Sequence, residues 1–158
     1  IYDRAQELRP AGAGISLWSN GVKVLNYLGL GDKLAALGGE MNAMEYRSHT
    51  DESLSYVDLR PLFERVGQRP YPVSRTDLQA MLLDACGPEC VHLGMPCVGV
   101  EQDEHSATAI FENGDRVSGD LVIGADGIHS AVRADVVGHC VDRRYARYVN
   151  WNGLVKAD

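Results

Sequence analysis

The sequence predicts an α/β fold, in which a layered core of helices and strands is interleaved with antiparallel strands. Three observations support this prediction. Leu121–Ala125 is a continuous apolar run, which is typical of a strand covered on both faces, as in a parallel sheet. Asn113-Gly114 is a strong signal for a hairpin turn. Four apolar residues recur at the i, i+3, i+4, i+7 spacing of a helix with one buried face: Leu78, Met81, Leu82 and Ala85.

The first elements follow from small-residue breaks between apolar positions. Residues 1–3 predict the end of a strand, and residues 10–16 (PAGAGIS) predict a loop because they are small. Residues 20–28 carry apolar side chains at helical spacing, and residues 32–37 predict a further short helix after two glycines.

The middle of the chain predicts strands, a loop and the clearest helix. Residues 44–59 predict two short strands around a turn at Asp51-Glu52. Residues 60–72 contain three prolines and predict a loop. Ser74 opens a helix, which Gly87-Pro88 ends.

The remaining elements complete the alternation of helices and strands. Residues 91–101 predict a strand bent near its proline, and residues 107–111 and 116–118 predict a hairpin. Residues 129–137 predict a helix, and residues 148–155 predict another strand. We expect one helical face to carry three residues: Ile128, Val132 and Val136.

Composition excludes several classes of protein. The 158 residues suffice for one domain core, and a net charge of -7 offers no attraction to nucleic-acid phosphates. No apolar run approaches the roughly 18 to 20 residues that span a bilayer, and no secretory pattern is visible. We therefore expect a cytoplasmic protein without nucleic-acid or membrane partners. Because the first residue is Ile1 and not Met, we expect the true N-terminus to lie further upstream.

The four cysteines predict reduced, partly buried thiols and no metal site. Cys86 and Cys90 have the spacing C-x3-C, but a zinc site would need a second close pair or nearby histidines.

The most informative segment is GDLVIGADGIHSAVR, residues 119–133, which carries D-G-x-x-S-x-x-R after an apolar strand. Asp126 places a carboxylate at the strand end, where α/β sheets bind ligands, and Gly127 permits a tight turn. Ser130 can cap the helix, whose free N–H groups suit a phosphate, and Arg133 adds a charge suited to phosphate. The alternative is a helix cap with a surface arginine.

This segment resembles the signature of the class A flavoprotein monooxygenases, the group that includes para-hydroxybenzoate hydroxylase. The resemblance implies an FAD/NAD(P)-binding Rossmann-like domain interleaved with an antiparallel β substrate domain. It implies that Asp126, Gly127 and Arg133 bind the cofactor and that the segment is tied to NAD(P)H use. The implied division is residues 1–43 and 71–142 for FAD, and residues 44–70 and 143–158 for the substrate domain.

Other segments resemble the same family. Asp3 and Arg4 match the end of the second strand, where an acid, usually Glu, binds the adenosine ribose. Gly14 and Ser16 match the loop along the flavin.

The resemblance also assigns Arg75 to the ribityl–phosphate chain and adds Val98 to the cofactor-binding set. The alternative for Arg75 is a surface arginine at a helix start, which the helix dipole disfavours unless an anion lies nearby.

Three stretches, residues 15–23, 69–75 and 143–155, resemble the FAD-dependent urate hydroxylases of bacterial purine catabolism. The resemblance implies that the amide of Asn150 contacts the purine, because an amide can both donate and accept hydrogen bonds. The alternative is an asparagine that pairs with backbone at a strand end. We expect Trp151 to pack rather than to bind substrate.

The implied reaction begins when NADH, or NADPH, reduces FAD. O2 then adds to the flavin, and the hydroperoxide hydroxylates urate to 5-hydroxyisourate. No residue is a convincing general acid or base. One alternative is a hydroxylase of the same family that acts on a phenol or an N-heteroaromatic acid. Another is a nucleotide-binding paralogue without hydroxylase activity.

Two family motifs are not found in the sequence. The resemblance places G-x-G-x-x-G before Ile1 and a Gly-Asp flavin motif after Asp158. We therefore expect that the 158 residues alone neither hold FAD tightly nor turn over.

Overall fold

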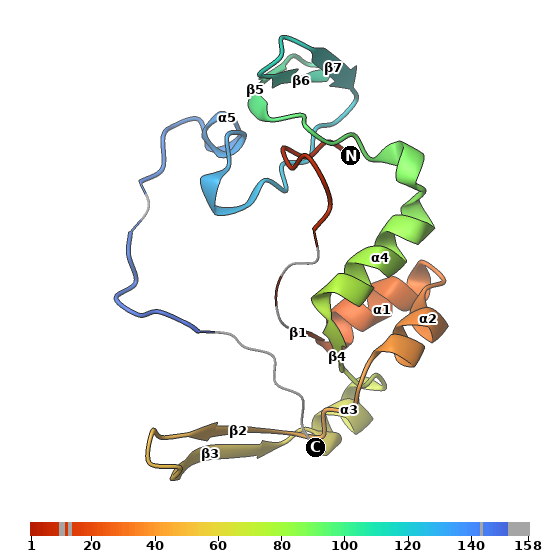
Figure 1. The fold of residues 1–158 in the computed structure, drawn as a ribbon, viewed down its shortest axis with the longest axis vertical. Helices are drawn as coiled ribbons and strands as arrows, with labels where there is room; N and C mark the ends of the chain where they lie inside the picture. The colour runs from red at the N-terminus through yellow and green to blue at the C-terminus, as the bar shows by residue number, and fades with distance from the viewer. Residues whose placement is uncertain (10–11, 13, 143, 152–158) are drawn as a thin grey trace. The chain divides into compact units, whose positions relative to one another are not determined.

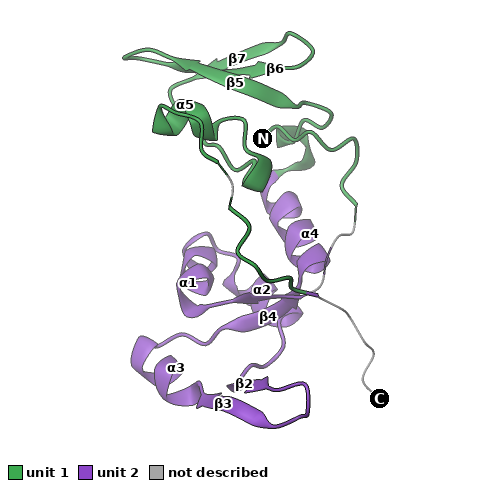
Figure 2. Cartoon of the chain, turned by 90° about the vertical axis from the view of Figure 1, so that its left-hand side faces the viewer, with its two compact units in different colours: residues 1–9, 87–150 green, residues 10–86, 151–158 purple. Residues whose placement is uncertain are grey.

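The computed structural model describes residues 1–9, 12, 14–142 and 144–151, which belong to two compact units. Unit 1 comprises residues 1–9 and 87–150, and unit 2 comprises residues 10–86 and 151–158 (Figure 2). Figure 1 gives the order of the helices and strands. Within the described residues, no helix has the length and apolar content needed to cross a bilayer.

Unit 2 combines helices with a two-stranded antiparallel ladder (Figure 1). Its packed elements are β1 (Gly14–Leu17), α1 (Ser19–Tyr27), α2 (Gly31–Leu37), β4 (Tyr71–Ser74) and α4 (Arg75–Cys86). The predicted helices at 20–28, at 32–37 and after Ser74 are confirmed. The predicted loop at residues 10–16 is wrong at its end, because residues 14–16 pair with β4.

The core of unit 2 lies where these helices meet the ladder. Leu34 and Val22 are 0% and 1% exposed, so both side chains are fully enclosed. On α4 the predicted stripe is only half right, because Leu82 and Ala85 are exposed. The buried core residues are Val22, Leu25, Leu30, Leu34, Val73, Leu78 and Met81.

A hairpin and a short helix complete unit 2. Strands β2 (Ala43–Arg47) and β3 (Ser53–Asp58) pair antiparallel, as predicted for residues 44–59. The loop predicted at residues 60–72 is wrong, because it contains α3 (Arg60–Val66). Pro61 lies in the first turn of α3, where a missing N–H costs nothing, and Gly67 ends the helix with φ 68°.

Unit 1 is built on an antiparallel three-stranded sheet, ordered β5 (Cys97–Gln102), β6 (Ala107–Phe111) and β7 (Arg116–Gly119). The predicted hairpin is confirmed, and Gly114 takes φ 89° in its turn. The strand predicted at residues 91–101 begins only at Cys97, after the proline that interrupts it.

The chain start joins this unit through a parallel bridge between Tyr2 and His92. The Tyr2 ring stacks on His92 at a centroid distance of 4.8 Å and contacts Phe111 at 4.9 Å. The sequence predicts the end of a strand at residues 1–3, whereas the structure has a single β-bridge there, between Tyr2 and His92.

The apolar run Leu121–Ala125 is not a strand, which corrects the sequence prediction. Leu121 is 74% exposed and Ile123 is 80% exposed. A strand is stabilised by the hydrogen bonds of its neighbour, and no described strand pairs with this run.

The last predicted elements are also shorter than expected. The helix predicted at residues 129–137 is a 3-10 turn, Gly127–His129, followed by α5 (Arg133–Val137). Of its expected apolar face, Val132 is buried, whereas Ile128 and Val136 are exposed. Residues 148–151 are not a strand, and residues 152–155 of that prediction lie outside the described residues.

Candidate functional site

The predicted motif forms a hydrogen-bonded loop in unit 1, residues 126–133, here called the Asp126 loop. Oδ1 of Asp126 accepts the Ser130 hydroxyl at 2.5 Å. Oδ2 accepts the N–H groups of Ala131 at 2.7 Å and Val132 at 3.2 Å. Desolvation acts to raise the pKa of Asp126, but these hydrogen bonds outweigh it and lower the pKa. The carboxylate is therefore ionised at neutral pH.

The local sequence explains this loop. A Cβ at Gly124 would lie 3.1 Å from Cβ of Val132, so a larger residue there would push the loop away. Gly127 turns the chain with φ 75°, a conformation that glycine adopts without strain. The Ser130 hydroxyl accepts the Arg133 N–H at 3.0 Å. The N-cap residue of α5 is nevertheless Val132, which makes no side-chain capping hydrogen bond, so Ser130 is not the N-cap that the sequence predicts.

Arg133 closes the loop from the other side. Its Nη2 donates to the Gly127 carbonyl at 2.7 Å, and Nη1 and Nη2 each lie 3.3 Å from the Ile128 carbonyl. The N–H groups of Ala131, Val132 and Arg133 are taken up within the loop. The expectation of free N–H groups for a phosphate is therefore wrong for these three groups.

A hydrogen bond ties α5 to the sheet of unit 1. Oδ2 of Asp135 accepts the Val100 N–H of β5 at 3.1 Å. Val98, two residues earlier on β5, is 54% exposed. This bond fixes the strand that carries Val98 relative to the helix that follows the Asp126 loop.

Asp3 and Arg4 are exposed at the start of unit 1. Oδ1 of Asp3 accepts the Ala5 N–H at 2.8 Å. The Asp3 backbone donates to the His92 carbonyl and accepts the Met95 N–H, both at 2.9 Å. The acid is thus held on a fixed backbone and faces solvent.

The predicted residues of unit 2 are brought together by the β1–β4 ladder. Gly14 pairs with Ser74 at the end of β4, directly before Arg75, and Gly12 lies close to the Arg75 side chain. A Cβ at Gly12 would lie 3.3 Å from Cδ and 3.4 Å from Nη1 of Arg75, and Gly12 has φ 95°. Ser16 is exposed on the same strand as Gly14. A side chain at position 12 would therefore crowd the exposed guanidinium.

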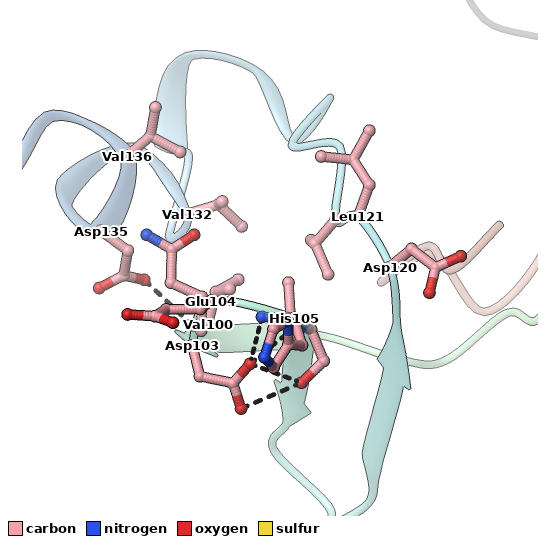
Figure 3. A pocket seen from close by; sticks show the side chains of 13 residues that line it. Val100, Asp103, Glu104, His105, Asp120, Leu121, Val132, Asp135 and Val136 are labelled. Atoms are coloured by element: carbon pink, nitrogen blue, oxygen red, sulfur yellow. Dashed lines mark hydrogen bonds between the residues drawn. The ribbon is translucent and has the colours of Figure 1, made fainter.

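A pocket of about 350 Å³ opens beside the sheet of unit 1 (Figure 3). Hydrogen bonds from the N–H groups of His105 and Ser106 lower the pKa of Asp103 on its rim. The polar run at residues 102–106 was the available sequence signal, but it indicates only a turn. None of the predicted site residues lines this pocket, and its ionisable lining residues are Asp103, Glu104, His105, Asp120 and Asp135.

Asn150 lies in a described stretch without regular structure and is exposed. Trp151 is 90% exposed, so the expected packing of its ring is not found within the described residues. The other predicted residues divide between the units: Asp3, Arg4, Val98, Asp126, Gly127, Arg133 and Asn150 in unit 1, and Gly14, Ser16 and Arg75 in unit 2.

The described residues contain no group of three histidine, cysteine, aspartate or glutamate side chains that could hold a metal ion. Cys86, Cys90 and Cys140 are exposed, and Cys97 is half-buried. The expectation of partly buried thiols is therefore wrong for the three exposed cysteines.

Unit 1 thus carries an ionised carboxylate beside Gly127, and unit 2 carries an exposed guanidinium beside Gly12. Residues 2–148 match the family described as FAD binding domain, and the chain belongs to this family.

Comparisons with known proteins extend this result. The chain is 50% identical over 161 residues to an FAD-dependent urate hydroxylase of Mycolicibacterium vanbaalenii, which matches all of this chain and 41% of that relative. It is 40% identical over 161 residues to a 3-amino-4-hydroxybenzoate 2-monooxygenase of Streptomyces cremeus, covering 99% of this chain and 40% of the relative. The chain thus spans about two fifths of the length of these relatives.

A solved structure is also similar. The crystal structure of Klebsiella pneumoniae HpxO complexed with FAD and uric acid matches 92% of this chain and 37% of its own, at 42% identity and a TM-score of 0.79. The predicted fold class, an incomplete FAD-binding domain with antiparallel segments, is therefore confirmed.

The residues present fit FAD. The ribityl and ribose hydroxyls of FAD are donors, which suit the ionised and exposed Asp126 carboxylate. The FAD diphosphate suits the Arg75 guanidinium, and the bare backbone of Gly12 leaves room beside that side chain. Arg133 fits less directly, since its Nη1 and Nη2 atoms already donate to the Gly127 and Ile128 carbonyls.

Proposed function

We propose that the full-length protein is an FAD-dependent hydroxylase that converts urate to 5-hydroxyisourate with O2 and NADH, or NADPH. The observation that carries the proposal is the 50% identity, across all of this chain, to the urate hydroxylase of Mycolicibacterium vanbaalenii. The structural similarity to HpxO, which was crystallised with FAD and uric acid, supports the same cofactor and substrate. Because the chain spans 41% of that relative, the activity is proposed for the whole protein.

The chain would supply the binding groups for FAD. We assign the ribityl–phosphate chain to Arg75 and a ribose or ribityl hydroxyl to Asp126, with Gly127 allowing close approach. FAD, when bound, supplies the redox chemistry and the activation of O2, whereas the protein positions the reactants and excludes water.

The remaining cofactor contacts are assigned by position. Asp3, with Arg4, would bind the adenosine ribose, and Gly14 and Ser16 would lie along the flavin. Val98 would contact the cofactor from β5, and Arg133, which also closes the Asp126 loop, would bind the cofactor through its positive charge.

We assign Asn150 to the substrate. Its amide can donate to a urate carbonyl and accept from a ring N–H. We also propose that residues 44–70 and 143–158 begin the substrate domain, and that residues 1–43 and 71–142 belong to the FAD-binding domain.

A second candidate function is hydroxylation of a phenolic or N-heteroaromatic acid. The 40% identity to the 3-amino-4-hydroxybenzoate 2-monooxygenase of Streptomyces cremeus favours it. This identity is lower than the 50% shared with the urate enzyme over the same length, so urate is the first candidate.

The experiment compares the two substrates directly. The full-length protein is loaded with FAD, and NADH oxidation in air is followed with urate, with 3-amino-4-hydroxybenzoate, and with neither. The proposal expects urate to accelerate NADH oxidation and to be consumed. Acceleration by the hydroxybenzoate alone would support the second candidate, and acceleration by neither compound would contradict both.

A further inference from the structure

We propose that Ser130 is a positioning residue, which holds the Asp126 carboxylate so that its Oδ1 atom is presented to a hydroxyl of the cofactor. The proposal rests on the proposed function, because Asp126 is the assigned hydroxyl acceptor. It adds a residue that does not contact the cofactor itself.

The hydrogen bonds of Asp126 distinguish its two oxygens. A carboxylate oxygen accepts about two hydrogen bonds. Oδ2 accepts two N–H groups, from Ala131 at 2.7 Å and Val132 at 3.2 Å. Oδ1 accepts the Ser130 hydroxyl and retains acceptor capacity. A hydroxyl donor from a ligand would therefore bind at Oδ1.

The direction of the Ser130 hydroxyl is fixed by its second hydrogen bond. Its Oγ accepts the Arg133 N–H at 3.0 Å, so the hydroxyl proton points away from that group. Oδ1 of Asp126, at 2.5 Å, accepts this proton. The Ser130 backbone N–H also donates to the Gly127 carbonyl at 3.1 Å, which holds the residue from the other side.

Loss of the hydroxyl has two consequences for Asp126. The carboxylate loses the donor that fixes Oδ1, while Oδ2 keeps its two N–H groups. The pKa of Asp126, which desolvation raises and the Ser130 and loop hydrogen bonds lower, moves upward when the Ser130 bond is removed. The ionised acceptor is then lost at a higher pH than in the native protein.

The matched variants are Ser130→Ala, Ser130→Thr and the control Ser118→Ala, each in the full-length protein. Ser118 also shares a hydroxyl hydrogen bond, with Thr108 at 2.8 Å, but it lies on β7 outside the Asp126 loop. Two quantities are measured: the FAD dissociation constant from flavin fluorescence, and the Asp126 carboxyl titration by carbon-13 NMR without FAD.

The proposal expects Ser130→Ala to weaken FAD binding about tenfold, because Asp126 loses the charge-assisted hydrogen bond that orients its Oδ1 atom for the cofactor hydroxyl. The Asp126 titration moves to higher pH in the same variant. Ser130→Thr restores both values because it keeps the hydroxyl, and Ser118→Ala changes neither. A role in folding alone would lower the melting temperature without moving the titration.

Other outcomes overturn the proposal. An unchanged Asp126 titration in Ser130→Ala overturns it, whether or not the protein binds FAD. If Ser130→Ala does not fold, Ser130→Cys replaces it. An unchanged Asp126 titration in Ser130→Cys also overturns the proposal. A native protein that binds no FAD contradicts the proposed function, and the NMR titration still decides whether Ser130 orients Asp126.

Discussion

Arg75 and Asp126 are the two charged side chains on which the proposed binding of FAD depends most. Arg75 lies against the bare backbone of Gly12, where a Cβ would approach Nη1 to 3.4 Å. Asp126 is held by three donors of its own loop. Both side chains are exposed, so each is accessible to a ligand.

Replacement of Arg75 by Gln should weaken FAD binding about tenfold or more, because a phosphate loses a charged, forked donor. Arg65→Gln is the control, since Arg65 is exposed in the last turn of α3. The dissociation constants of both variants are measured in the full-length protein by flavin fluorescence. Equal FAD affinities of Arg75→Gln and Arg65→Gln would show that Arg75 does not bind FAD.

Asp58 gives a prediction about acid stability. Hydrogen bonds from the Arg60 side chain and N–H lower its pKa from 3.8 to about 2. A carboxylate with a depressed pKa in the folded state stabilises the fold above its unfolded pKa, and this contribution disappears as the pH falls through the folded pKa. Between pH 3.8 and about 2, the native protein should therefore lose stability relative to Asp58→Asn.

The measurement is chemical unfolding of the native protein, Asp58→Asn and Arg60→Gln across this pH window. Arg60→Gln should reduce the pH dependence because it removes the side-chain donor to Asp58. If the unfolding free energy has the same pH dependence in all three proteins, the Asp58–Arg60 ion pair does not contribute to stability.

At the scale of the element, the sequence predicts the helices and hairpins that depend on contacts between residues near one another in the chain. Helix α1 and the β2–β3 hairpin follow from side-chain spacing and turn residues, and both were predicted. Residues 121–125 were predicted as a strand from their apolar character, but strand formation needs a partner that lies elsewhere in sequence. The prolines of residues 60–72 predict a loop, but Pro61 lies in the first turn of α3, where proline is tolerated.

For the candidate site, the sequence likewise predicts the local turn but not the hydrogen bonds that form only in the folded loop. The D-G-x-x-S-x-x-R spacing indicates a turn with a capping serine. The Ser130 hydroxyl does accept the Arg133 N–H, but the N-cap residue of α5 is Val132. Spacing could not show that Asp126 would take up the N–H groups of Ala131 and Val132, because that depends on the folded loop. The residue assignments for FAD and urate stay predictions.

The contact between α2 and β4 should be sensitive to one methyl group. A Cβ at Gly38 would lie 2.7 Å from Cβ and Cδ1 of Tyr71, so Gly38→Ala must displace β4 or the end of α2. We expect a loss of about 1–3 kcal/mol in unfolding free energy. Gly99→Ala is the matched control, because nothing lies within 4 Å of its added Cβ.

Melting temperatures of the two variants test this expectation. A clear decrease for Gly38→Ala and little change for Gly99→Ala support the close packing. A Gly38→Ala variant as stable as the native protein would show that β4 shifts without cost.

At the scale of the whole molecule, the chain spans 41% of the urate hydroxylase that it resembles at 50% identity. The proposed activity therefore belongs to the full-length protein.

The isolated 158 residues should not form a stoichiometric complex with FAD, whereas the full-length protein should. The reason is that this chain spans only 41% of the length of the urate hydroxylase that it resembles. Gel filtration with absorbance at the flavin band measures the bound FAD per chain. A yellow one-to-one complex of the isolated 158 residues would contradict the expectation.

The most direct test of the proposed function is the source of the oxygen in the product. The FAD-loaded full-length protein is mixed with urate and NADH under oxygen-18 gas, and the product is analysed promptly by mass spectrometry. The proposed monooxygenation predicts one labelled oxygen atom in each molecule of oxidised urate. Unconsumed urate, or a product without the label, would contradict it.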